Sequence, residues 1–186
     1  MATITATRAT TLSDLGAVVL SVPGSSATSG VALTEVAIGF VRKTTIALTS
    51  VALTLADNGS NGSGGTSLYT FTEGGVSILG AFANIVVSYG SVSDANLVMA
   101  LGSVTAAADG TLTSTEANII PSTAAATTSG AATVKAAMTT PLALNGSGTA
   151  AICFINMATS TDPSTNNAIT LSGTIDLYWI WSGDGA

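Results

Sequence analysis

Residues 169–181 alternate between apolar and polar side chains almost without interruption. Successive side chains point to opposite sides only in an extended chain, so this pattern predicts a strand with one buried and one solvated face. The predicted buried face consists of Ile169, Leu171, Ile175, Leu177, Trp179 and Trp181, and the predicted solvated face of Thr170, Ser172, Thr174 and Asp176.

Related patterns predict strands along most of the chain, over residues 31–41, 44–56, 67–72, 85–90, 97–106, 131–138, 150–157 and 169–181. Within 44–56 the apolar positions change phase between Leu48 and Val51, which predicts a bulge near Thr49 and Ser50. Residues 57–65 are almost entirely glycine, asparagine and serine, a composition that predicts a flexible loop.

Two segments are low in complexity. Residues 1–30 are rich in threonine, alanine and serine, and we interpret them as an N-terminal arm or an irregular first strand. Residues 107–130 predict a long loop with one short helix near 114–119, which a capping box of Thr113 and Glu116 would begin. The expected fold class is therefore all-β: an antiparallel β-sandwich or jelly roll over residues 31–186, preceded by the arm.

Composition excludes several kinds of protein. Apolar residues make up 47% of the chain, charged residues only 8%, and the mean hydropathy is +0.58, which argues against disorder. The net charge is −6, and the four basic residues Arg8, Arg42, Lys43 and Lys135 are too few to favour nucleic acid or an anionic membrane as partner. No apolar run reaches the ~18 residues that cross a bilayer, and the N-terminal residues fit a secretory signal poorly.

The side chains offer little catalytic or metal-binding chemistry. Histidine is absent, and the single Cys153 lies in an apolar segment, which predicts a small buried side chain rather than a reactive thiol. With one cysteine no internal disulfide can form, so we expect the protein to be made in a reducing cytoplasm. We expect no enzymatic activity, no metal and no cofactor, although carboxylates brought together from distant strands stay open as an alternative. The acids are dispersed along the chain: Asp14, Glu35, Asp57, Glu73, Asp94, Asp109, Glu116, Asp162, Asp176 and Asp184.

Four features allow a functional and a plain structural interpretation. Residues 57–62 partly match a calcium loop but lack its further acids, so a turn is preferred. The Asn-Gly-Ser triplets would be glycosylated only in a secreted eukaryotic protein, and Asn-Gly also favours hairpin turns. Lys135 is either an isopeptide donor or a surface lysine, and we prefer the surface lysine. Trp179 and Trp181 form either a sugar platform or part of the core, and their phase favours the core.

A family resemblance adds what the residue chemistry leaves open. The segment from Asp109 to Gly130, together with the closing run Leu-Ser-Gly-Thr-Ile-Asp-Leu-Tyr-Trp-Ile, resembles small proteins encoded near the capsid genes of tailed bacteriophages. These proteins resemble head decoration, or cement, proteins: β-rich, jelly-roll-like and often trimeric. The resemblance covers the C-terminal part of the chain, and no functional residue is carried over from it.

The resemblance implies a structural virion protein on the outside of the capsid. Its expected partners are the major capsid protein and two further copies of itself in a homotrimer, with the arm as a clasp on a neighbour or on the shell. A tail or host-adhesion jelly roll and a secreted carbohydrate-binding module stay open as alternatives.

Overall fold

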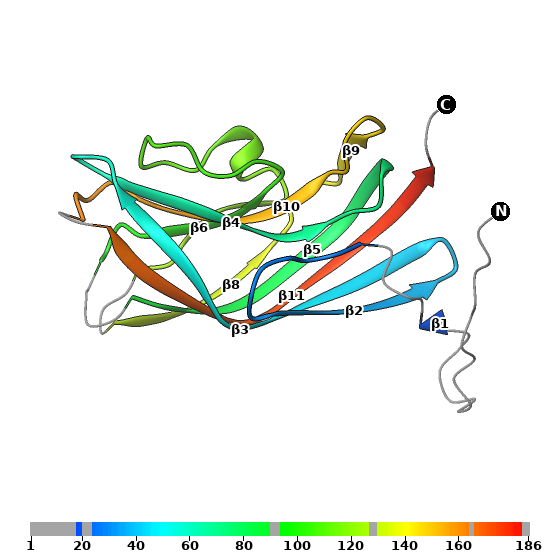
Figure 1. Ribbon diagram of the computed structural model, residues 1–186, viewed down its shortest axis with the longest axis horizontal. Helices are drawn as coiled ribbons and strands as arrows, with labels where there is room; N and C mark the ends of the chain where they lie inside the picture. Colours follow the sequence, from blue (N-terminus) through cyan, green and yellow to red (C-terminus); the bar gives the residue numbers. More distant parts are fainter. Residues whose placement is uncertain (1–17, 20–23, 90–93, 127–129, 164–165, 184–186) are drawn as a thin grey trace.

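The computed structural model describes residues 18–19, 24–89, 94–126, 130–163 and 166–183, in which eleven strands and one 3-10 turn form and no α-helix occurs (Figure 1). The strands are β1 (Val18–Val19), β2 (Val31–Ile38), β3 (Val41–Asp57), β4 (Gly62–Thr70), β5 (Gly74–Ser88), β6 (Val98–Gly102), β7 (Ile120–Ala124), β8 (Ala131–Ala137), β9 (Leu142–Gly146), β10 (Ile152–Thr159) and β11 (Asn167–Gly183), with the turn η1 (Ser114–Glu116).

The strands form two packed antiparallel layers (Figure 1). One layer has the order β2-β3-β11-β5, with β8 and β9 both on the far side of β5 and β1 beside β2. The other has the order β4-β10-β6-β7. Four antiparallel pairs, β3 with β11, β4 with β10, β5 with β8 and β6 with β7, therefore form one long ribbon that folds over itself. This is the jelly-roll arrangement, and it confirms the expected fold class.

The core lies between the two layers. Ile175, Leu177 and Trp179 of β11 are fully buried, whereas Thr174 on the same strand is exposed, so the predicted alternation is confirmed there. Trp181 was expected in the same buried face but is 40% exposed. It stands near the end of β11, where that strand runs past the second layer, and its indole Nε1 donates to the Glu73 carbonyl oxygen at 2.9 Å (Figure 1).

The predicted bulge in β3 is present. Leu48 pairs with Gly173 and Val51 with Leu171, so Thr49 and Ser50 together oppose a single residue of β11. Ser50 has φ +51°, the left-handed conformation that a bulge residue adopts, and its N–H donates to the Ser172 hydroxyl at 3.1 Å.

The glycine-rich segment 57–65 is not a flexible loop throughout. Its turn is limited to residues 58–61, where the Asn58 N–H donates to the Asn61 carbonyl oxygen at 2.9 Å, and β4 begins at Gly62. A Cβ at Gly64 would overlap the Thr54 carbonyl oxygen, and one at Gly65 would overlap the Asn156 side chain. These glycines allow close approach of neighbouring chain segments, so their number does not indicate mobility.

The segment 107–130 is also more ordered than its composition predicts. The short helix is present as the single turn η1, where the Thr113 N–H donates to the Glu116 carboxylate at 3.2 Å. Strand β7 follows it, and Ile119 and Ile120 are buried in the core. The fully buried Asn156 holds both ends of the segment between Val104 and Glu116. Its side-chain amide donates to the carbonyl oxygens of Val104 and Glu116 at 2.9 and 2.8 Å.

Most of the predicted arm lies outside the described residues. Within the part that the structure describes, β1 pairs with β2, and Ser25 exchanges two backbone hydrogen bonds with Thr70 at the end of β4. The Thr28 hydroxyl donates to the Ser67 carbonyl oxygen. Residues 24–30 therefore follow the edge of β4 before β2 begins.

Candidate functional site

The outer face of the β3-β11-β5-β8 sheet is the most distinctive surface of the described residues. Alternation along β5 turns Ala83 and Ile85 toward the core, and it turns Phe82, Asn84 and Val86 outward. Phe82 is 57% exposed and Val86 43% exposed, although the outer face of a sandwich is usually polar. We call this surface, around Phe82 on β5 and its neighbours on β11 and β8, the outer sheet face.

An aromatic pair lies on the outer sheet face. The rings of Phe82 and Tyr178 are 6.1 Å apart between centroids and meet edge to face at 86°. Tyr178 comes from β11, where it occupies the same phase as Thr174 and Asp176. Edge-to-face pairs are favourable beyond the area they bury, and here the pair stays accessible to a partner.

Next to this pair lies a small charged cluster. The Lys43 ammonium is 3.0 Å from the Asp176 carboxylate, which also accepts a hydrogen bond from the Thr45 hydroxyl at 2.6 Å. The hydrogen bond that Lys43 donates to Asp176 is the main cause that raises the pKa of Lys43 above its usual value. The Lys43 ammonium is also 5.7 Å from the Tyr178 ring centroid. Lys43 and Asp176 thus neutralise each other beside the Tyr178 ring.

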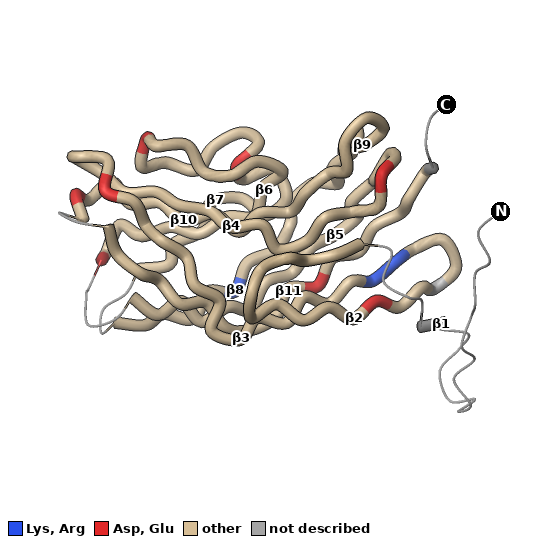
Figure 2. Tube along the Cα trace, viewed as in Figure 1, with Lys and Arg blue, Asp and Glu red and all other residues tan. Residues whose placement is uncertain are grey.

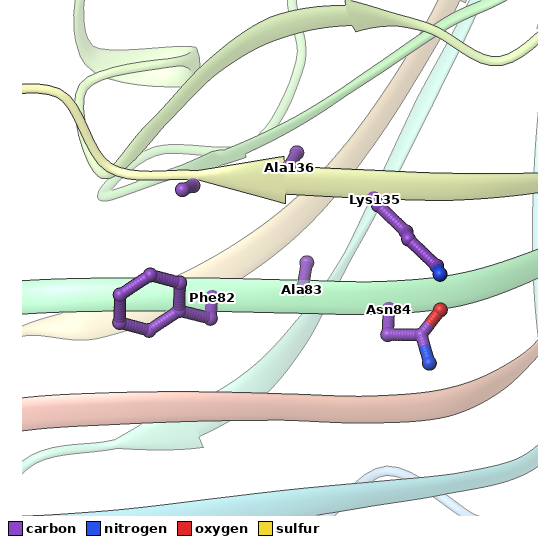
Figure 3. Close-up of a pocket in the computed structure, with 6 residues that line it drawn as sticks. Phe82, Ala83, Asn84, Lys135 and Ala136 are labelled. Atoms are coloured by element: carbon purple, nitrogen blue, oxygen red, sulfur yellow. The ribbon is translucent and has the colours of Figure 1, made fainter.

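On the other side of Phe82 the face is hollowed. A shallow pocket of about 400 Å³ lies over β5 and β8, lined by Phe82, Ala83, Asn84, Lys135, Ala136 and Ala137 (Figure 3). In the register of the two strands Asn84 lies opposite Lys135, and Figure 3 shows the Lys135 side chain extending toward Asn84. Ala83 and Ala136 belong to the inward phases of their strands, so the side chains that open onto the pocket are those of Phe82, Asn84, Lys135 and Ala137.

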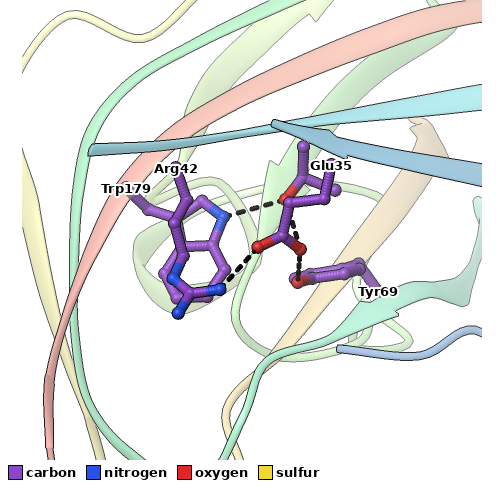
Figure 4. A network of polar contacts seen from close by, with 5 residues as sticks. Glu35, Arg42, Tyr69 and Trp179 are labelled. Carbon is purple, nitrogen blue, oxygen red and sulfur yellow. Dashed lines mark hydrogen bonds and ion pairs between the residues drawn. The ribbon is translucent and has the colours of Figure 1, made fainter. Parts of the chain in front are cut away.

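A second polar cluster is buried between the layers (Figure 4). Glu35 of β2 is 1% exposed, and its carboxylate accepts hydrogen bonds from Arg42 Nη1 at 2.9 Å and from the Tyr69 hydroxyl at 3.2 Å. The Arg42 guanidinium is 5.4 Å from the Trp179 ring centroid, and Trp179 Nε1 donates to the Thr44 hydroxyl at 2.9 Å.

This buried cluster serves the fold. Burial, and then the nearby Glu35 charge, raises the pKa of Tyr69 far above its usual value. The Glu35 carboxylate is closed off from solvent and fully partnered, so it connects β2, β3 and β4 rather than facing a substrate.

The structure supports the plain interpretation of most residues weighed in the sequence. Cys153 is fully buried, and burial raises the pKa of its thiol to about 12. Asp57 accepts a hydrogen bond from the Gly59 N–H at 2.7 Å within the β3–β4 turn, and the Asn145 side chain closes a similar turn after β9. Lys135 is exposed, and Trp179 is in the core.

Across the described residues the acids stay dispersed, and no group of three or more cysteine or acidic side chains is placed to hold a metal ion. No helix in the described part of the chain is long and apolar enough to cross a membrane. A scan against models of known protein families finds no match, and neither does a search of curated proteins.

The sequence reading missed the central residue of the outer sheet face. Around Phe82 both phases of the strand are apolar or small, so the pattern does not distinguish inward from outward positions. The outward position of Tyr178 could have been predicted from the sequence, because Tyr178 shares the phase of Thr174 and Asp176. The available signal was therefore an aromatic side chain in an otherwise polar phase.

Proposed function

We propose that this chain is a structural virion protein, a head decoration protein that binds the outside of a phage capsid and stabilises the shell. In this proposal it has no enzymatic activity, and it acts by contacts alone. Its partners are the major capsid protein and further copies of itself, most simply in a trimer.

The observation that carries the proposal is an apolar aromatic face on the outside of a closed jelly roll. The core of the sandwich is already covered by its own two layers, so Phe82 and Val86 are not needed outside to complete it. Exposed apolar surface beyond scattered single residues is typical of a site that binds another macromolecule. Jelly rolls are frequent in viral shells, which supports the proposal at the level of fold analogy.

The role fits the remaining chemistry. A decoration protein adds stability through many weak contacts repeated over a lattice, which requires no reactive group. A surface rich in threonine with a net charge of −6 keeps crowded copies and whole particles from adhering to one another.

Carbohydrate binding is the second candidate, because the outer sheet face holds two aromatic rings beside Asn84 and Asp176. The rings meet at 86°, however, so they do not form the flat platform on which a sugar ring stacks. This geometry favours a protein partner over a glycan.

Mass spectrometry of gradient-purified virions tests the proposal. We expect this chain at a copy number that is a fixed fraction of the capsid protein's, and we expect mild release of it to lower the temperature at which particles open. Its absence from virions, or a copy number matching tail components, would contradict the proposal, and binding on a glycan array would favour the second candidate.

A further inference from the structure

Charge is distributed unevenly over the described residues (Figure 2). Their three basic residues are Arg42, Lys43 and Lys135, of which Arg42 pairs with the buried Glu35 and Lys43 with Asp176. Lys135 has no ion-pair partner among the described side chains. The one unneutralised cation of this part of the chain therefore lies at the pocket beside Phe82.

Three of the acidic residues lie together at one end of the described structure, away from Lys135. Asp57 ends β3, Asp109 precedes η1 and Asp162 follows β10, and these three residues mark one end of the sandwich, which we call the acidic loop end. The backbone at Gly110 is in close contact with the β3–β4 turn and with the end of β10. A Cβ added there would lie only 2.5 Å from the Asn61 side chain and 2.9 Å from the Thr159 carbonyl oxygen. Figure 2 shows acidic segments and no basic segment at this end of the described chain.

A cyclic trimer requires this kind of asymmetry. In a ring of three, each interface joins two different patches, so every copy must carry a surface and its complement. The outer sheet face offers an apolar aromatic centre with an unpaired cation, and the acidic loop end offers the opposite charge. Long-range attraction between such patches steers association and fixes its orientation.

We propose that the outer sheet face, centred on Phe82 and Lys135, docks the acidic loop end of a second copy of this chain. The inference rests on the self-association included in the proposed function, and it names the two surfaces that meet. Phe82 is the apolar anchor of the contact, and Lys135 pairs with a carboxylate of the neighbouring loop end.

The test measures the molar mass of the full chain by light scattering across a dilution series at low and at high salt. We expect wild type to assemble above its 18.1 kDa monomer mass and to dissociate more readily as salt rises, since salt screens exposed charges. Phe82→Ala should raise the concentration of half-assembly at least about tenfold, as expected for an aromatic hot spot. Lys135→Gln should raise it about threefold and flatten the salt dependence.

Matched controls lie outside both patches. Phe40→Ala removes an aromatic ring that is 90% exposed at the tip of the β2–β3 hairpin, and Glu73→Gln removes an exposed acid away from the loop end. Both should leave assembly unchanged. Dissociation by Phe40→Ala with none by Phe82→Ala would overturn the assignment.

A double-mutant cycle tests whether the two patches touch each other. Asp57→Asn with Asp109→Asn removes two charges of the loop end and keeps side-chain oxygens that accept the turn hydrogen bonds. If the patches meet, combining these changes with Lys135→Gln weakens assembly less than the product of the separate effects. Fully multiplicative effects, or a wild type that stays monomeric, would contradict the inference.

The outcomes also separate this inference from the proposed function. A chain that is present on virions but monomeric in solution, with variants that behave alike, sinks the inference and leaves the function standing. A chain that assembles through these patches but is absent from virions would support the inference and contradict the proposed function.

Discussion

At the scale of single residues, the buried ion pair of Glu35 and Arg42 is the most consequential interaction. The Glu35 side chain is fully buried, and the Arg42 side chain is 22% exposed, so the carboxylate depends on its partners for its solvation. A buried pair adds little net stability compared with an apolar replacement, but removal of one partner leaves the other charge without compensation.

Glu35→Ala is therefore expected to lower the free energy of unfolding by about 3 kcal/mol, since it leaves Arg42 unpaired and the Tyr69 hydroxyl without its acceptor. Chemical denaturation monitored by tryptophan fluorescence measures this loss. Thr34→Ala, at the exposed neighbouring position on β2, serves as the control and should change the free energy by about 0.5 kcal/mol or less. Equal effects of the two substitutions would show that the network is not structural.

The buried thiol of Cys153 predicts a pH dependence. Burial raises its pKa from 9.0 to about 12, so between these values the unfolded chain loses the thiol proton while the folded chain keeps it. The folded state then binds more protons, and stability must fall as the pH rises above 9. Below pH 9 this contribution is fully present.

Denaturation curves between pH 8 and pH 10 check this behaviour. Wild type should lose stability over this range, whereas Cys153→Ala should be less stable throughout because of its cavity but should vary less with pH. In the folded chain the thiol should also resist alkylating reagents. Parallel pH profiles for the two proteins would mean that the thiol does not contribute.

At the scale of elements, the bulge in β3 allows a direct test. Ser50 holds φ +51° without the freedom of glycine. Ser50→Gly should raise the free energy of unfolding by up to about 1 kcal/mol, because glycine adopts this conformation without steric cost. Ser50→Val should lower it by at least about 1 kcal/mol, because a β-branched residue is strained there. Thermal unfolding resolves the two signs, and a stabilising valine would contradict the bulge.

Several elements were readable from sequence because local pattern and tertiary environment agree. In β11 one face meets the core and the other meets solvent, so alternation survives over most of its length. The bulge at Ser50 was readable for the same reason, since a phase change in a half-buried strand has few other causes.

Other elements were hidden by composition. Strand β5 runs from Gly74, but its first half contains Gly74, Gly75 and Gly80 and its two faces are both largely apolar. Strands β7 and β9 are short and rich in small side chains, so they carry no periodic signal. The glycines of β4 resemble a loop in the sequence, because glycine is required there only by close contacts with other strands. Gly64 lies against Thr54 of β3, and Gly65 lies against Asn156 of β10.

The candidate site was harder to foresee than the fold. Tyr178 shares the outward phase of Thr174 and Asp176, but the outer sheet face also depends on β5 lying beside β11 and on β8 lying beside β5. Those pairings join residues as far apart as Lys135 and Asp176 on one surface, and they follow from the topology rather than from any local segment. The buried Glu35 was likewise counted among dispersed acids.

At the scale of the whole molecule, the N-terminal residues allow a test that the fold makes more specific. Residues 24–30 follow the edge of β4, so their deletion should destabilise the sandwich itself. Deletion of residues 2–17 should instead weaken attachment to shells more than it lowers the melting temperature. Paired measurements of shell binding and thermal unfolding on the two truncations check this, and full occupancy by the shorter truncation would contradict a clasping role for the arm.

The most direct measurement is electron cryomicroscopy of purified virions with and without this chain. We expect extra density on the outer surface of the shell, into which two-layered jelly rolls fit in groups of three, with the outer sheet face of each against the acidic loop end of the next. Density at the tail, or no difference between the two particle preparations, would contradict it.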